Sequence, residues 1–328
     1  MRLGGTANYL VEVKNKSEVR QAETWAEKRQ LPVIMIGGGS NIIWRDDGYH
    51  GLIIVNRIPG FKKIDEDDDT VTLWVGGGKE WDRTVAEAVA MGLSGIEGLS
   101  LIPGSTGATP VQNVGAYGQE IAETLVSIEA YDRFEKDFVT LGRDDCAFGY
   151  RTSRFKTVDK GRFLITSITL RLNKQPMQAP FYESLQAYFD EHKVTKHTPA
   201  TIRKAVIAIR SSKLPDPAKV PNNGSFFGNP IIDKNHYEHI KAAYKDVVAW
   251  EVGKKQYKIS AGWLIEKAGF KGYKDTETGM AIWPKQSLVF INEKAHTTAD
   301  LLDFRQKILD KVQTMFAIML EQEPELLP

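Results

Sequence analysis

The stretch "LPVIMIGGGSNII", residues 31–43, is an apolar run that reaches three consecutive glycines and then becomes apolar again. Such a run is typical of a buried strand, and the glycines allow the backbone to turn tightly after it. Upstream, residues 7–13 alternate as a half-buried strand does, and a helical pattern follows with Ser17 as its predicted N-cap. A further strand at 51–55 completes a small α/β unit that is predicted to end near Gly60.

A second unit is predicted to begin at residue 61. A strand at 70–78 ends in another glycine triplet and is followed by a helical pattern at 80–92. Strands predicted at 124–132 and 162–172 close the unit.

Between these elements lies "PGSTGATPVQNVGAYG", residues 103–118, which is rich in Gly, Pro, Thr and Asn and carries no charge. Loops of this length inside a compact domain are usually functional. Its small residues would let a flat ring or a diphosphate lie against the backbone, and the Gln112 and Asn113 amides suit the edge of a heterocycle. A plain surface loop is the alternative, and the absence of charge argues against it.

The glycines at 37–39 have two readings. Adjacent backbone N–H groups in a glycine turn can hold a pyrophosphate, but an ordinary tight turn has the same sequence. The Rossmann and P-loop fingerprints are both absent. The loop "VGGGKEW" at 75–81 is a weaker candidate of the same kind.

The remaining chain predicts a bridging helix and a last α+β unit. Thr198 is the expected N-cap of that helix and Pro199 its first residue, and "LPDP" ends it near residue 214. We therefore divide the chain into 1–60, 61–214 and 215–328. The final helix, from about Thr298, is expected to place one apolar stripe on the core: Leu301, Phe304, Ile308, Val312, Met315 and Met319.

The composition excludes several classes of protein. The 328 residues are 42% hydrophobic and 26% charged with a formal net charge of +1, so no strong field favours nucleic acid or an anionic membrane. No apolar run is long enough to span a bilayer. A single cysteine, Cys146, permits no internal disulfide, so we expect a reducing, cytoplasmic setting. His236 and His239 have no third ligand nearby, so we expect no metal.

A second short stretch, "NNGSFFGNP" at 222–230, places Ser225 before two adjacent phenylalanines. Successive side chains of a strand point to opposite faces, so Phe226 and Phe227 cannot both enter the core from a regular strand. A serine that caps a turn is one reading of this segment, and a hydroxyl held in a dry pocket is the other.

Eight blocks follow one another along the chain: "GGGSN", "IPGSTGATPVQNVGAYGQEI", "CAFGYRTSRFK", "KLPDP", "NNGSFFGNP", "SAGWLIEKAGFKGY", "KQSLVFIN" and "LEQEPEL". They occur in the order seen in the UDP-N-acetylenolpyruvoylglucosamine reductase family, which this chain resembles from about residue 3 to 327. The stretch "APFYESL" resembles the branch with an extra substrate-covering loop.

The resemblance implies two α/β subdomains that hold FAD non-covalently, similar to the vanillyl-alcohol-oxidase type of fold, and a third, C-terminal α+β domain that covers the substrate. It implies that the two loops and one residue of the bridging helix bind the cofactor. These residues are Gly37, Gly38, Gly39, Ser40, Asn41, Gly104, Ser105, Gly107, Ala108, Gln112, Asn113, Gly115, Tyr117 and Arg210.

The implied reaction uses NADPH to reduce UDP-N-acetylglucosamine enolpyruvate to UDP-N-acetylmuramate for peptidoglycan synthesis. Ser225 resembles the family's proton donor, Arg151 its catalytic arginine and Glu325 the glutamate that completes the trio. Phe226 and Phe227 are expected to help exclude water from the serine. The resemblance also implies substrate contacts near the diphosphate and sugar from Tyr150, Tyr182, Lys213 and Asn229.

Two further expectations concern the ends of the chain and its state. The chain ends three residues after Glu325, where the family usually continues into a strand, so we expect that glutamate in a terminus prone to fraying. We expect a monomer with small-molecule substrates. Two other functions remain open: a related flavin oxidoreductase with another substrate, and a flavin- or UDP-sugar-binding protein without catalysis.

Overall fold

The computed structural model describes residues 1–328 and divides them into two units. The N-terminal unit comprises residues 7–39 and 50–212, and the C-terminal unit comprises residues 1–6, 40–49 and 213–328. The expected boundary at residue 60 inside the first of these units stays a prediction. No helix is both long and apolar enough to cross a membrane.

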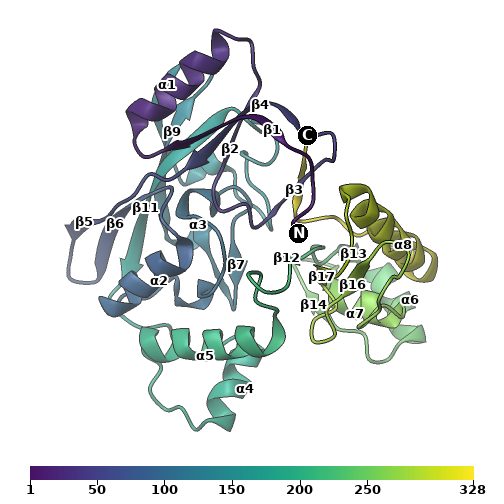
Figure 1. Ribbon diagram of the computed structural model, residues 1–328. Coiled ribbons are helices and arrows are strands. Elements are labelled where there is room, and N and C mark those ends of the chain that lie inside the picture. Colours follow the sequence, from purple (N-terminus) through teal and green to yellow (C-terminus); the bar gives the residue numbers. More distant parts are fainter. The chain divides into compact units, whose positions relative to one another are not determined.

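The N-terminal unit begins with a three-stranded sheet in the order β1-β4-β2, with β2 and β4 parallel. Figure 1 shows helix α1 beside this sheet. The Asn15 side chain, not Ser17, caps the helix by accepting from Glu18 N, so the predicted cap was two residues too late. The elements are β1 (Ala7–Val13), α1 (Lys16–Glu27), β2 (Val33–Ile36) and β4 (Tyr49–Asn56).

A five-stranded antiparallel sheet in the order β10-β9-β11-β6-β5 forms the larger part of this unit. Alternate residues of β6, β9 and β11 join helix α2 in one apolar core. Its strands and helix are β5 (Phe61–Glu66), β6 (Thr70–Gly76), α2 (Trp81–Ala90), β9 (Leu125–Asp132), β10 (Asp137–Gly142) and β11 (Phe163–Asn173).

Two helices complete the unit and share a small core of their own, α4 (Glu183–Glu191) and α5 (Pro199–Lys213). Thr198 caps α5 as predicted, since its Oγ1 accepts from Thr201 N at 3.2 Å. The segment between α2 and β9, which contains the loop at 103–118, holds only short elements: η1 (Glu97–Leu99), η2 (Thr106–Ala108), β7 (Gly115–Ala116), β8 (Gln119–Glu120) and α3 (Ile121–Thr124). A further short element, η3 (Asp144–Cys146), follows β10.

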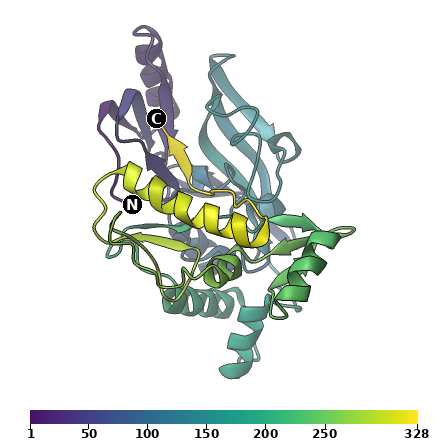
Figure 2. The ribbon, with the colours of Figure 1, turned by 90° about the vertical axis from the view of Figure 1, so that its right-hand side faces the viewer.

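The C-terminal unit contains two three-stranded sheets, β12-β17-β16 and β13-β15-β14, and a parallel pair of β18 with β3. Figure 2 shows the chain running back from the end of helix α8 to β18. The strands are β3 (Ile42–Trp44), β12 (Asn222–Ser225), β13 (Ile231–Asp233), β14 (Ala249–Glu251), β15 (Gln256–Ile259), β16 (Met280–Ile282), β17 (Val289–Asn292) and β18 (Glu325–Leu327). The helices are α6 (Lys234–Ala243), α7 (Ala261–Lys267) and α8 (Thr298–Phe316).

Helix α8 presents most of its predicted stripe to the core of this unit. Leu301, Phe304, Ile308 and Val312 are fully buried. Met319 was wrongly included, because the helix ends at Phe316, Ala317 adopts a left-handed conformation, and Met319 is exposed.

Candidate functional site

Three glycine-bearing loops meet in the N-terminal unit, and backbone hydrogen bonds hold two of them together. Gly107 N donates to Gly77 O at 2.8 Å, and Trp81 N, at the start of α2, donates to Gly104 O at 3.0 Å. The loop after β2 lies against the same segment, because a Cβ on Gly38 would be 3.1 Å from Gly104 Cα. The ends of strands β2 and β6 and the start of helix α2 thus bring the predicted glycine loops together.

The loops are so close that side chains would not fit between them. A Cβ on Gly37 would lie 1.9 Å from Ser105 Oγ, and one on Gly107 would lie 3.0 Å from Gly77 Cα. Close backbone approach of this kind forms a concave set of N–H groups that suits a pyrophosphate. This cradle fits the diphosphate of FAD. The loop with Gly77, the weaker candidate from sequence, also follows a strand directly and contacts Gly107.

Arg210, on α5, is a second feature that fits an anionic cofactor. Its side chain hydrogen-bonds the Tyr117 hydroxyl, and burial lowers the pKa of its guanidinium from the ordinary value. Its Nε is buried without a hydrogen-bond partner in the protein. Burial likewise raises the pKa of Tyr117. A buried cationic donor with unused capacity is costly unless a ligand satisfies it.

Helix α5 is attached to α2 by an ion pair that sequence reasoning missed. Arg203 donates to both oxygens of Asp82, at 2.7 and 2.8 Å, and Leu101 N donates to Asp82 Oδ1 at 2.5 Å. Burial raises the pKa of Asp82, but these hydrogen bonds outweigh it, so its pKa lies below the ordinary value. The pair orients the helix that carries Arg210.

Arg151 lies at the edge of the long loop. Its backbone is left-handed, with φ of 55°, and its guanidinium Nη2 donates to Gly115 O at 2.7 Å. The guanidinium also lies 5.1 Å from the centre of the Tyr150 ring. A non-glycine residue at positive φ is often found at functional sites, where surrounding structure holds it.

Ser225 and Glu325 both belong to the C-terminal unit, whereas Arg151 belongs to the other unit. Ser225 ends β12, and Glu325 begins β18 with its N–H donating to Asn41 O at 2.9 Å. The buried Asn223 side chain joins these segments, because its Nδ2 donates to Ser40 O and Ile42 O.

The expected fraying of Glu325 was wrong. Glu325 pairs in register with Ile42, and the tail is fixed further by the hydrogen bond from Glu323 N to Phe226 O. Two backbone ladders therefore hold the last residues, which the sequence pattern alone did not reveal.

Phe226 and Phe227 are both fully buried, since β12 ends at Ser225 and the chain beyond it is no longer a regular strand. The Phe226 ring stacks on Phe290 with centroids 4.2 Å apart, and Phe227 meets both rings edge-on. These rings fix the backbone that follows Ser225. Asn229 is fixed as well, because its Oδ1 accepts from Ala261 N at the start of α7.

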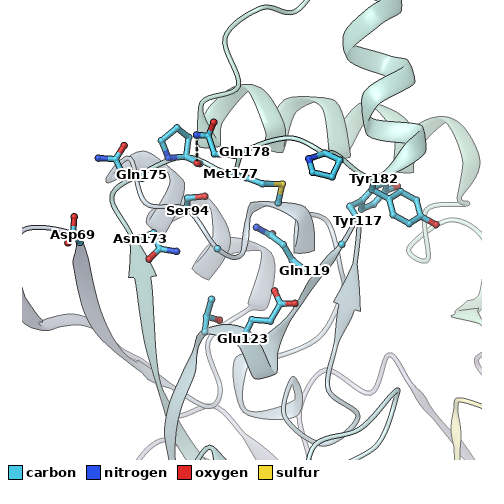
Figure 3. Close-up of a pocket in the computed structure, with 15 residues that line it drawn as sticks. Asp69, Ser94, Tyr117, Gln119, Glu123, Asn173, Gln175, Met177, Gln178 and Tyr182 are labelled. Atoms are coloured by element: carbon cyan, nitrogen blue, oxygen red, sulfur yellow. Dashed lines mark hydrogen bonds between the residues drawn. The ribbon is translucent and has the colours of Figure 1, made fainter. Parts of the chain in front are cut away.

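Tyr117 and Tyr182 meet edge-on, with ring centroids 5.8 Å apart, at one end of a cavity of about 660 Å³ (Figure 3). Both rings and the loop through Met177 belong to the N-terminal unit. Asp69 and Glu123 are the charged residues of the lining, so the cavity itself does not supply the positive charge that a diphosphate needs. The remaining lining residues are Ser94, Gly95, Gly118, Gln119, Thr124, Asn173, Gln175, Pro176, Gln178 and Pro180.

Three more of the predicted site residues, Lys213, Tyr150 and Asn113, have the following positions. Lys213 is exposed at the end of α5, where its carbonyl accepts from Trp283 Nε1, and Tyr150 is exposed beside Arg151. Asn113, predicted to contact the cofactor, donates to Glu120 and Gly149 O and accepts from Ala122 N. The amide of Asn113 therefore shapes the loop through protein contacts.

His236 serves the fold, since its Nε2 lies 2.7 Å from Phe316 O. No group of three or more His, Cys, Asp or Glu side chains is arranged to hold a metal ion.

Two family models match the chain. Residues 7–133 match an FAD binding domain, and residues 216–327 match the C-terminal domain of UDP-N-acetylenolpyruvoylglucosamine reductase. With the glycine cradle and the buried arginine, these matches define an FAD-dependent oxidoreductase. The expectation of an FAD-binding α/β part followed by a C-terminal α+β domain is confirmed.

Curated relatives agree over nearly the whole length. The chain is 38% identical to the UDP-N-acetylenolpyruvoylglucosamine reductase of Cupriavidus pinatubonensis over 98% of this chain and 94% of the relative. It is 40% identical to that of Alcanivorax borkumensis over 90% of this chain and 84% of the relative. The chain belongs to the UDP-N-acetylenolpyruvoylglucosamine reductase family.

A solved structure supports the fold. The crystal structure of the reductase from Thermus caldophilus matches with a TM-score of 0.66, covering 97% of this chain and 92% of that chain at 22% identity.

Proposed function

We propose that this chain reduces UDP-N-acetylglucosamine enolpyruvate to UDP-N-acetylmuramate, using NADPH and bound FAD, in peptidoglycan precursor synthesis. The observation that carries the proposal is the near-full-length similarity to reductases of this name, supported by the convergence of three glycine loops that suits an FAD diphosphate. FAD held by these loops would supply the two-electron redox chemistry that links NADPH to the enolpyruvyl group.

Gly37 to Gly39, Gly104, Ser105, Gly107 and Ala108 would line the diphosphate, and Arg210 would use its buried Nε there. Ser40, Asn41, Gln112, Gly115 and Tyr117 complete the proposed cofactor residues. Asn113 contributes by holding the loop in place.

Ser225 donates the proton in this proposal. Hydride arrival at the enolpyruvyl group leaves negative charge on the neighbouring carbon, and that carbon must receive a proton. A serine hydroxyl is a weak acid, so it needs a fixed position and little competing water. The end of β12 and the buried Phe226 and Phe227 rings after it provide a fixed backbone for the hydroxyl.

Arg151 stabilises the developing enolate through the substrate carboxylate. A guanidinium already fixed by Gly115 O loses little orientational freedom when the charge appears. Glu325, held in β18, supports the proton donor from the same unit. Tyr150, Tyr182, Lys213 and Asn229 bind the UDP diphosphate and sugar in this proposal.

We also propose that the enzyme acts as a monomer in the cytoplasm. Its sole cysteine is buried and has no second cysteine to pair with, which suits a reducing compartment. Light scattering of the FAD-loaded protein tests the first point, with a mass of 36.8 kDa plus the cofactor as the expected value.

The catalytic proposal is tested by an anaerobic absorbance experiment. One equivalent of NADPH should bleach the flavin, and UDP-N-acetylglucosamine enolpyruvate should restore its colour. Ser225→Ala should keep the bleaching rate and slow the recovery at least 10²-fold, since a positioned general acid contributes about 10²–10⁴-fold. Bleaching without recovery in the unmodified protein would point to a different substrate, and failure to bind FAD would refute the proposal.

A further inference from the structure

Glu120 lies in the N-terminal unit on strand β8, which pairs with strand β7, and β7 carries the Gly115 carbonyl that contacts Arg151. Glu120 and Gly115 are direct partners in the short β7–β8 ladder. Arg151 Nη2 donates to Gly115 O at 2.7 Å, and Arg151 Nη1 lies 4.0 Å from Glu120 Oε1. The Arg151 guanidinium is therefore close to both the Gly115 carbonyl and the Glu120 carboxylate.

The Glu120 carboxylate is itself held in place. Its Oε2 accepts from Asn113 Nδ2 at 2.7 Å, and Asn113 is almost fully buried. Asn113 also donates to Gly149 O at 3.1 Å and accepts from Ala122 N at 3.1 Å. One amide therefore ties the β7–β8 loop to the segment that carries Arg151.

Gly115 leaves the space that the guanidinium occupies. A Cβ at this position would lie 2.8 Å from Arg151 Nη1 and 2.9 Å from Glu120 Cγ. Both distances are shorter than van der Waals contact, so a side chain there would displace the guanidinium or the carboxylate. The position of the Arg151 guanidinium thus depends on three features: the absence of a side chain at Gly115, the fixed Glu120 carboxylate and the left-handed backbone of Arg151 itself.

We propose that Glu120 is a positioning residue for Arg151, and that Gly115 and Asn113 complete a socket for the guanidinium. This inference rests on the proposed function, in which Arg151 meets the substrate carboxylate. Glu120 acts in two opposing ways: it restrains the guanidinium, and its negative charge competes with the substrate carboxylate for the same cation. The socket therefore favours correct orientation over tight binding of the carboxylate.

Glu120→Gln removes the negative charge, and with it both the restraint on the guanidinium and the competition with the substrate carboxylate, while an amide oxygen can still accept from Asn113 and hold the loop. In stopped-flow absorbance, flavin bleaching by NADPH should stay within about twofold of the unmodified protein. Recovery of the flavin colour with the enolpyruvate substrate should slow by about 10–100-fold. Titration of the oxidised enzyme should show UDP-N-acetylmuramate bound at least as tightly as before, with the affinity for UDP-N-acetylglucosamine, which lacks the carboxylate, unchanged.

Gly115→Ala is the independent variant, and it is tested at full FAD occupancy because Gly115 is also a proposed cofactor residue; it should slow the recovery step more than the bleaching step. Glu135→Gln removes an exposed carboxylate on the turn between β9 and β10, and it should alter neither half-reaction. Equal slowing of both half-reactions by Glu120→Gln, or equal weakening of the two UDP ligands, would overturn the positioning role.

A substrate-free measurement keeps this inference separate from the proposed function. Glu120→Gln, Arg151→Lys and the double variant form a thermal-unfolding cycle in the FAD-loaded protein. Non-additive shifts in Tm support the socket even if the enolpyruvate proves to be the wrong substrate. Additive shifts overturn the socket even if the proposed reaction occurs.

Discussion

The Asp82–Arg203 ion pair should stabilise the N-terminal unit, with a coupling free energy between the two side chains of about 2 kcal/mol. The pair is bidentate, at 2.7 and 2.8 Å, and its side chains are 24% and 15% exposed. Exposed pairs contribute roughly 0.2–1 kcal/mol, and removal of one partner of a buried pair costs about 3–5 kcal/mol. The intermediate exposure and the two parallel hydrogen bonds place this pair between those limits.

Urea unfolding of Asp82→Asn, Arg203→Gln and the double variant measures this coupling directly. The matched control is the neighbouring Arg83–Glu80 pair, whose side chains are 77% and 59% exposed at 3.0 Å. The control cycle should give no more than about 0.5 kcal/mol.

The pH dependence of the same coupling has a definite sign. The pKa of Asp82 is lower in the folded protein than its ordinary value, so the ion pair stabilises the fold fully above the unfolded pKa of about 3.9. That stabilisation is lost as the pH falls through the lower, folded pKa. A coupling no larger than that of the control at pH 7, or one that grows on acidification, would refute the assignment of this pair as the attachment of α5.

Three further predictions concern single positions. Gly78→Ala should lower the unfolding free energy by about 3 kcal/mol or more, because the new Cβ would lie 2.3 Å from backbone atoms. Gly142→Ala is the control: the atom nearest to its Cβ would be 3.4 Å away, so it should lower the unfolding free energy by about 1 kcal/mol or less. Burial raises the pKa of Cys146 to about 11, so a thiol reagent at pH 8 should modify the native protein at least about 100-fold more slowly than the urea-unfolded chain; equal rates would contradict this burial. Leu327→Asp should lower the unfolding free energy by about 3 kcal/mol, because it places an unpaired charge at a buried position of β18, and an unchanged midpoint in urea would show that the terminal strand is not held.

The regular elements were predictable where one local pattern decided them. The strand at 7–13 and the helix from Pro199 followed from alternation and from a Thr-Pro start, and both are present. Strand β5, "FKKIDE", was missed because nearly all of its side chains are exposed and no apolar alternation marks it. It forms because it pairs with β6, which no local pattern encodes.

The end of α8 shows a related limit. Helices often end at glycine or proline, but Ala317 takes the left-handed position here, so the sequence contained no stop signal. The apolar spacing continued to Met319 by coincidence, and the predicted stripe was extended by one residue too many.

The site residues that could be predicted are those that lie in unusual local sequences. Glycine triplets after strands, an uncharged loop and a serine among aromatics stand out in a chain, and the family resemblance supplied roles for them. The residues that hold these groups are ordinary in sequence. Asp82 lies in the first turn of α2, and its partner Arg203 lies 121 positions further along the chain.

Asn223 and Glu120 make the same point in chemical terms. Each uses a side-chain amide or carboxylate to fix a neighbouring segment, Asn223 by donating to Ser40 O and Ile42 O, and Glu120 by accepting from Asn113. An enzyme that relies on a bound flavin for its redox chemistry needs its own side chains mainly for position and for one proton. Small displacements of such groups reduce rates strongly, so the supporting residues affect catalysis as directly as the residues they hold. We therefore expect substitutions at these supporting positions to separate the two half-reactions more cleanly than substitutions in the glycine cradle, which would weaken FAD binding and affect both.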